Sequence, residues 1–140
     1  MVTYHRSNVD GLEIFYREGG PRTAPHLLLL HGFPTSSHMF RNLIPALADR
    51  YHLLAPDLPG LGFSDAPDRK RFRYTFESLT KVIGSFTQVI GLDRFAIYVF
   101  DYGAPVGFRL ALAHPEQITA VSSQNGNAYV EGLSDGWNPI

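Results

Sequence analysis

Asp101 is the residue whose position most strongly suggests chemistry, because it stands between two apolar segments. The run Phe95–Phe100 has the aromatic and β-branched composition of a strand, and the run Gly103–Ala113 has the spacing of an amphipathic helix. A carboxylate is costly to hold between buried elements, whereas the free amides and positive dipole end of a helix N-terminus favour its ionised form. A tight strand–turn–helix join of this kind can present one side chain as a nucleophile.

Two glycines after Asp101 agree with such a nucleophile elbow. Gly103 is expected where the strand and the helix approach too closely for a side chain, and Gly107 where the helix packs against the sheet. The backbone amide of Tyr102 can supply one donor of an oxyanion hole. The alternative is that Asp101 caps the helix, a common role for aspartate at this kind of join, and the segment taken alone favours that alternative.

A second motif, "HGFP", occupies residues 31–34 after an apolar run. Gly32 allows a sharp turn that leaves the amide of Phe33 free to point into a cavity, as the other donor of an oxyanion hole. An ordinary strand-to-helix turn explains the same residues when the motif is taken alone. His31 is expected to organise the loop by hydrogen bonds rather than to act as a base. The two motifs together favour the nucleophile interpretation of Asp101.

The elements that must position these motifs alternate along the chain. Strands are predicted over residues 2–6, 12–17, 26–31, 51–55, 95–100 and 118–123, and helices over about 36–50, 75–90 and 103–113. Pro45 marks a kink or a second start within the first helix. A β-hairpin followed by alternating strands and helices predicts an α/β fold with a mostly parallel sheet. Sites in such sheets gather at the carboxyl ends of strands, here after Leu30, Ala55, Phe100 and Ser123.

Composition restricts the possible functions. A chain of 140 residues with 44% hydrophobic residues can bury the core of one domain, and the net charge of -1 offers no general attraction to nucleic acid or membrane. The absence of cysteine excludes disulfides, thiolate catalysis and Cys-ligated zinc. The longest aliphatic run, Leu27–Leu30, is far shorter than a membrane span, and a cytoplasmic location is expected. The basic cluster Asp68–Arg73 is interpreted as a solvated loop.

The glycine-rich loop Asp57–Ser64, "DLPGLGFS", is the other candidate for ligand binding. It lacks both G-x-G-x-x-G and Gly-Lys-Ser/Thr, so nucleotide binding is not expected. Asp57 is instead predicted to accept hydrogen bonds from local backbone amides. Neither a cofactor nor a metal is expected anywhere in the chain.

Three segments resemble the α/β-hydrolase superfamily in order and spacing, and most of all its branch with an aspartate nucleophile, the epoxide hydrolases and haloalkane dehalogenases. They are "LLLLHGFPTSSHMFRNLIPAL", "LLAPDLPGLGFSD" and "DYGAPVGFRLALAHPEQI". The last piece, "SQNGNAYVEGLSDGWNPI", resembles the exit towards a cap domain. The resemblance implies a partial core over residues 1–125 and an exit segment over 126–140, with a cap beginning near Trp137. One departure is Val99, which stands where G-x-Nuc-x-G has its first glycine.

The resemblance also implies a mechanism. Asp101 would attack a saturated carbon, form an alkyl-enzyme ester, and release it when an activated water attacks the ester carbonyl. Haloalkane dehalogenases usually bind the halide through N–H donors at the positions of Phe33 and Tyr102, which here supply no such side-chain donors. Fluoroacetate dehalogenases carry arginines where this chain has Tyr102 and Pro105. A small epoxide is therefore the favoured substrate, and an alkyl halide is the alternative. Pro34 implies a tight turn in which the preceding peptide bond is cis.

The base that activates the water is not identified. None of the six histidines sits where this family places its catalytic histidine, and Asn125 stands where some dehalogenases have the triad acid; the histidines are His5, His26, His31, His38, His52 and His114. The resemblance therefore implies an N-terminal half that is catalytically incomplete by itself. Two alternatives are a truncated, non-catalytic binding protein and a half-fold that self-associates. In either case the strand at 118–123 would be an exposed edge open to a second copy or to a complementing C-terminal fragment.

Overall fold

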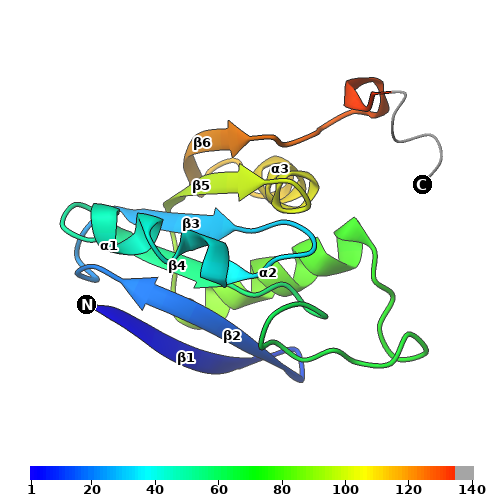
Figure 1. Ribbon diagram of the computed structural model, residues 1–140, viewed down its shortest axis with the longest axis horizontal. Coiled ribbons are helices and arrows are strands. Elements are labelled where there is room, and N and C mark those ends of the chain that lie inside the picture. The colour runs from blue at the N-terminus through cyan, green and yellow to red at the C-terminus, as the bar shows by residue number, and fades with distance from the viewer. Residues whose placement is uncertain (135–140) are drawn as a thin grey trace.

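The computed structural model describes residues 1–134, which form a six-stranded sheet in the order β1-β2-β4-β3-β5-β6 (Figure 1). The strands are β1 (Val2–Val9), β2 (Leu12–Gly19), β3 (His26–Leu30), β4 (His52–Pro56), β5 (Phe95–Phe100) and β6 (Ile118–Gln124). β2 pairs with β1 and β4 in antiparallel fashion, whereas β3 runs parallel to β4 and β5, and β5 runs parallel to β6. This confirms the predicted α/β fold, with a hairpin leading into a mostly parallel sheet.

The hairpin closes through a two-residue turn at Asp10 and Gly11. Both residues have positive φ angles, 52° and 82°, which is the backbone pattern whose twist matches the two flanking strands. The amide of Gly11 donates to the side-chain oxygen of Asn8 at 3.2 Å. This local support lets β1 extend to Val9, past its predicted end at residue 6, whereas β2 reaches Gly19 through its pairing with β4.

The helix predicted over residues 36–50 is wrong as a single element. The structure contains a 3-10 turn, η1 (Ser37–Phe40), followed by the short helix α1 (Leu43–Leu47). Pro45 explains the break, because a proline inside a longer helix would remove a hydrogen bond and clash with the preceding turn. As the third residue of α1 it occupies a position whose amide has no helical partner.

The two longer helices have the predicted boundaries. α2 (Phe76–Ile90) begins after Thr75, whose side chain accepts a hydrogen bond from the Ser78 amide at 3.1 Å. It ends at Gly91, which adopts the left-handed conformation with a φ of 77°. α3 (Gly103–Ala113) follows β5 directly. The short η2 (Val130–Gly132) closes the described chain, and Trp137 and the end of the predicted exit segment lie outside the described residues.

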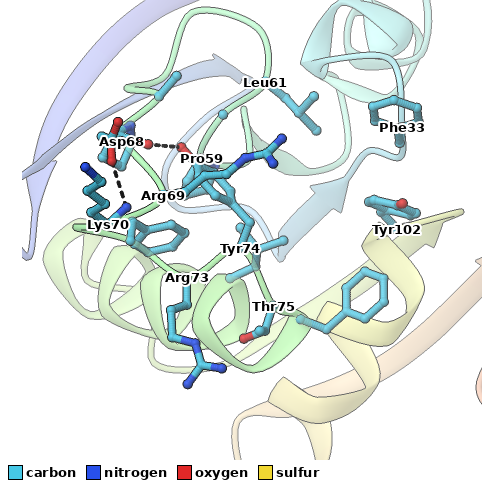
Figure 2. A pocket seen from close by; sticks show the side chains of 16 residues that line it. Phe33, Pro59, Leu61, Asp68, Arg69, Lys70, Arg73, Tyr74, Thr75 and Tyr102 are labelled. Atoms are coloured by element: carbon cyan, nitrogen blue, oxygen red, sulfur yellow. Dashed lines mark hydrogen bonds between the residues drawn. The ribbon is translucent and has the colours of Figure 1, made fainter.

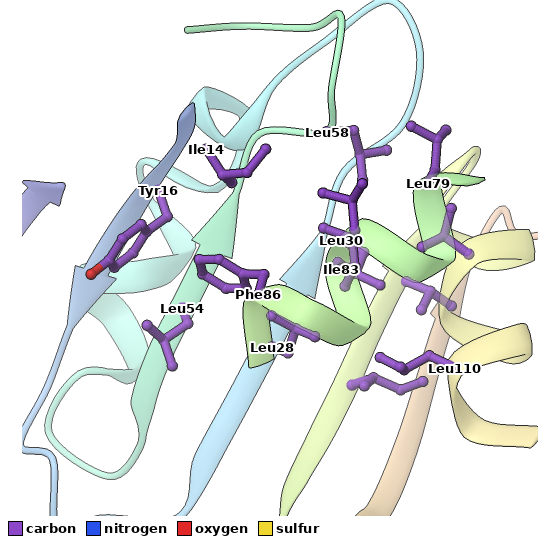
Figure 3. Close-up of a cluster of buried hydrophobic side chains, with 14 of the residues drawn as sticks. Ile14, Tyr16, Leu28, Leu30, Leu54, Leu58, Leu79, Ile83, Phe86 and Leu110 are labelled. Carbon is purple, nitrogen blue, oxygen red and sulfur yellow. The ribbon is translucent and has the colours of Figure 1, made fainter. Parts of the chain in front are cut away.

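Leucines of the central strands pack on both faces of the sheet. Leu28 and Leu30 point to the face that α2 and α3 cover (Figure 3), whereas Leu29 points to the opposite face, against η1 and α1. This alternation is that of a strand buried on both sides. Phe86 of α2 and Leu110 of α3 fill the first of these layers. Each such side chain stabilises the fold by about 1.5–3 kcal/mol relative to an exposed one.

β6 lies at the edge of the sheet, as the sequence predicts for this segment. From Thr119 to Gln124 its residues are exposed, and Val121 retains half of its accessible surface. Within residues 1–134, none of the helices has the length and apolar character needed to cross a bilayer.

Candidate active site

Asp101 occupies a strained turn between β5 and α3. Its φ angle is 49°, in the left-handed region that residues with a side chain rarely adopt. Such a conformation costs about 1–3 kcal/mol and persists only where the surroundings enforce it. The turn therefore holds the Asp101 side chain directly after the carboxyl end of β5 and two residues before the beginning of α3.

Three glycines make room for this turn. A Cβ on Gly103 would lie 2.2 Å from the carbonyl oxygen of Leu30, and one on Gly107 would lie 2.4 Å from Cγ1 of Val99. Both distances are far below van der Waals contact, so the close approaches predicted at these two positions are confirmed. On the facing loop, a Cβ on Gly32 would lie 2.3 Å from Cβ of Asp101.

The amides expected to form an oxyanion hole converge on Asp101 itself. The amide of Phe33 donates to Oδ1 of Asp101 at 2.8 Å, and the amide of Tyr102 donates to the same oxygen at 2.6 Å. Both are short, charge-assisted hydrogen bonds. Among the described residues, Oδ2 accepts no hydrogen bond. One oxygen is therefore fixed by two amides, while the other has no hydrogen-bond partner among residues 1–134.

The capping alternative for Asp101 does not describe this geometry. A capping side chain accepts from the second or third amide of the helix. Here the residue at the N-cap position of α3 is Tyr102, which makes no side-chain cap, and the Asp101 carboxylate accepts from the Tyr102 amide and from the distant Phe33.

Aromatic rings flank the carboxylate. The rings of Phe33 and Tyr102 stack with their centroids 5.5 Å apart, and Phe76 meets Tyr102 edge to face at 5.1 Å. The peptide bond between Phe33 and Pro34 is cis, as expected from the sequence. Figure 2 shows Phe33 and Tyr102 facing one another at one side of a cavity.

His31 organises the loop beneath these rings. It is fully buried, its Nδ1 is 2.9 Å from the carbonyl oxygen of Gly32, and its Nε2 accepts from the Leu58 amide at 2.9 Å. These partners assign a neutral ring with the proton on Nδ1, which donates to Gly32. Burial lowers the pKa of His31, which favours this neutral form. With both ring nitrogens engaged, His31 has the loop-organising arrangement expected from the sequence.

Asp57 fixes the glycine-rich loop beside the site. Its carboxylate is fully buried, with Oδ1 accepting from the Ser37 amide at 2.7 Å and Oδ2 accepting from the Phe63 amide at 2.8 Å. The Ser64 hydroxyl donates to the Asp57 carbonyl oxygen at 2.7 Å. The predicted hydrogen bond to a local backbone amide is confirmed by Phe63, whereas the Ser37 amide comes from a loop 20 residues away.

A cavity of about 1280 Å³ opens between the loop from residue 59 to 75 and the pair Phe33 and Tyr102 (Figure 2). Its wall combines aromatic and charged side chains; these are Phe33, Phe72, Tyr74, Phe76, Tyr102, Asp68, Arg69, Lys70 and Arg73. Residue types and spacing alone do not indicate that the basic cluster lies here, because a loop's path across a site depends on contacts distant in the chain.

The remaining predicted residue, Asn125, follows β6 at the same edge of the sheet. It has a φ angle of 49° and is exposed. The segment after it passes the beginning of α3, since a Cβ on Gly126 would lie 2.6 Å from Cβ of Ala104. No histidine among residues 1–134 hydrogen-bonds the Asp101 carboxylate.

A second polar cluster lies at the opposite, amino ends of the parallel strands. Glu18 is buried and joined to His52 at 2.8 Å, and Nδ1 of His52 lies 2.9 Å from Nδ1 of His26. Burial raises the pKa of Glu18, but hydrogen bonds from His52 and Arg22 outweigh this and hold it below its usual value. The sequence analysis missed this cluster, although His26 and His52 begin adjacent strands in matching register.

Residues 25–139 match the family model described as the alpha/beta hydrolase fold. The chain belongs to the alpha/beta hydrolase fold family. It is 52% identical over 142 residues to an uncharacterized hydrolase of Saccharomyces cerevisiae, YNR064C, which covers 100% of this chain and 48% of that protein. It is 34% identical over 121 residues to a haloalkane dehalogenase of Bradyrhizobium diazoefficiens, covering 86% of this chain and 38% of that enzyme.

The chain is also similar to solved structures of two kinds of hydrolase, a haloalkane dehalogenase and an epoxide hydrolase. Haloalkane dehalogenase DbeA from Bradyrhizobium elkanii has a TM-score of 0.85 at 32% identity, covering 90% of this chain and 42% of that one. Epoxide hydrolase VrEH1 from Vigna radiata has a TM-score of 0.81 at 32% identity, covering 87% of this chain and 39% of that one. This chain thus spans less than half the length of these relatives.

Proposed function

We propose that this hydrolase opens epoxides, with Asp101 as a nucleophile that forms an alkyl-enzyme ester. The observation that carries the proposal is the convergence of the Phe33 and Tyr102 amides on one oxygen of Asp101. A residue with only a structural role has no need of a strained φ angle together with two short amide hydrogen bonds to one carboxylate oxygen.

The geometry divides the work between the two carboxylate oxygens. Oδ2 of Asp101 attacks a ring carbon of the epoxide, so that a carbon–Oδ2 bond forms as the ring carbon–oxygen bond breaks. The ring oxygen leaves as an alkoxide and takes a proton from solvent or an acid. The bond to Oδ1 becomes the carbonyl of the new ester, still held by the amides of Phe33 and Tyr102.

The same two amides serve the second step. When water attacks Cγ of Asp101, negative charge develops on Oδ1, which already lies 2.8 Å and 2.6 Å from the two donors. One preorganised donor of this kind is worth about 2.7–4 kcal/mol in the transition state. The water itself needs a base, and the described residues place no histidine at Asp101. We therefore infer that the 140-residue chain forms the ester but releases it slowly.

An alkyl halide is the second candidate substrate. The likeness to haloalkane dehalogenases, at 34% identity over most of the chain, favours it. The side chains of Phe33 and Tyr102 disfavour it, because neither carries an N–H that could hold a departing halide. The aromatic side chains of the cavity wall suit either substrate.

Intact-protein mass spectrometry separates these candidates. The folded chain is incubated with styrene oxide and, separately, with 1-bromobutane. The proposal predicts a mass increase equal to one epoxide and little change with the bromide. A mass increase with the bromide alone would show that the substrate is an alkyl halide and not an epoxide. No increase with either reagent would contradict the nucleophile and favour a non-catalytic binding protein.

A further inference from the structure

We propose that the cavity beside Asp101 selects substrates that carry a carboxylate, which Arg69 receives while the reactive carbon meets Asp101. This inference rests on the proposed function, because it names the substrate class of the same site. It concerns the basic cluster that the sequence analysis interpreted as solvated loop. The juxtaposition that carries it is a cationic loop on one side of the cavity and the Phe33–Tyr102 pair on the other.

The charges along the cavity wall are unbalanced. Arg69, Lys70 and Arg73 line it together with a single carboxylate, Asp68. Oδ1 of Asp68 accepts from the backbone amide of Lys70 at 2.8 Å, so this carboxylate supports the turn. Within residues 1–134, none of the three cations forms an ion pair. The wall therefore presents positive charge that the protein itself leaves uncompensated.

Arg69 is the cation that faces the reactive side. Figure 2 shows its guanidinium extending across the cavity between Leu61 and Tyr74, on the side that looks towards Phe33. Lys70 and Arg73 also line the cavity, but in the same view their charged ends extend away from Phe33. The Arg69 charge also influences Tyr74: burial raises the pKa of the Tyr74 hydroxyl, and the nearby Arg69 charge opposes that rise.

The surroundings define what the anion must be attached to. The wall next to Asp101 is aromatic, since Phe33 and Phe76 each pack against the ring of Tyr102. A carboxylate bound at Arg69 would therefore be joined to the reactive carbon by an apolar spacer lying against these rings. The guanidinium fork suits a carboxylate because it can donate two parallel hydrogen bonds.

An arginine here also solves an electrostatic problem. The ionised nucleophile repels any second anion that enters the cavity, so an anionic substrate gains access only where a cation offsets that repulsion. A neutral substrate has no such requirement. Discrimination between an acid and its neutral ester therefore reports the contribution of Arg69 directly.

The test compares alkylation of the 140-residue chain by epoxyundecanoate and by its methyl ester, followed by intact-protein mass spectrometry. We expect the acid to react about tenfold faster than the ester at low salt. Arg69→Gln is expected to bring this ratio to one or below. Arg71→Gln, which removes the same charge from an exposed residue of the same loop that does not line the cavity, is the matched control and is expected to keep the ratio. A wild-type ratio of one or less, or a ratio that survives Arg69→Gln, would overturn the inference.

A binding measurement that needs no reaction distinguishes this inference from the proposed function. Phenylbutanoate and phenylbutanamide are titrated into the wild type and Arg69→Gln, with backbone amide chemical shifts as the readout. Tighter binding of the acid that Arg69→Gln removes supports the carboxylate site even where no epoxide alkylates Asp101, in which case only the proposed function fails. Equal binding of acid and amide to the wild type overturns the carboxylate site, whatever the alkylation shows.

Discussion

Replacing Gly32 by alanine tests whether the two amides and Asp101 work as a unit. The added Cβ would lie 2.3 Å from Cβ, 2.5 Å from Oδ1 and 2.8 Å from Cγ of Asp101, and no flexible side-chain end is there to yield. The carboxylate must move off the amides of Phe33 and Tyr102, or the loop must shift. Overpacking of this kind costs about 1–3 kcal/mol of folding stability, and displacing an attacking group by about 1 Å can cost about a hundredfold in rate.

The assay pairs thermal unfolding with the rate of epoxide adduct formation. We expect Gly32→Ala to lower Tm by about 3–9 °C and to slow alkylation by about a hundredfold, because the attacking carboxylate is displaced from its position. Gly84→Ala is the matched control, because its new Cβ meets only Cδ1 of Leu110 at 3.6 Å and replaces a glycine inside α2. That control should raise Tm slightly and leave alkylation unchanged. Alkylation of a folded Gly32→Ala chain at the wild-type rate would refute the reasoning.

Three further predictions concern stability and assembly. Burial lowers the folded-state pKa of His26, and the charge of His52 lowers it further, so the folded protein binds fewer protons than the unfolded chain. Tm should therefore fall as pH drops from about 7 to about 5, and it should fall less steeply in His26→Gln. An equally steep fall in His26→Gln would contradict this assignment. Asp57→Asn keeps one acceptor for two buried amides and should cost about 1–3 kcal/mol in urea unfolding, whereas an unchanged midpoint would show that the loop rearranges freely. The 140-residue chain should self-associate through β6 in sedimentation velocity, and Val121→Lys should weaken that association; a monomeric wild type contradicts it.

The elements around Asp101 follow from local signals. β5 and α3 have the boundaries predicted for them, because an apolar run ends at a charged residue and a glycine opens the next periodic segment. α2 is equally local, with Thr75 and Gly91 marking its two ends. The apolar spacing of the segment at 36–50 suits one long helix, whereas the structure has a turn and then a short helix around Pro45, which confirms the second start predicted as one outcome of that proline.

The site itself was only partly predictable. The sequence indicated that Phe33 and Tyr102 contribute amides, but their convergence on Oδ1 of Asp101 depends on how two loops distant in sequence meet at the carboxyl ends of β3 and β5. The position of Arg69 depends likewise on the path of a long loop, and the Glu18 cluster depends on strand register. None of these contacts has a local signature, so residue type and spacing alone do not reveal them.

The most direct test of the central claim is to map the site of covalent attachment. The chain is treated with styrene oxide and digested, and its peptides are sequenced by tandem mass spectrometry. Asp101→Ala is treated in the same way. Asp10→Asn is the control, because it alters another aspartate of positive φ, on the exposed hairpin turn. We expect an ester on Asp101 in the wild type and in Asp10→Asn, and none in Asp101→Ala. A label that lies elsewhere, or that persists in Asp101→Ala, would contradict Asp101 as the nucleophile.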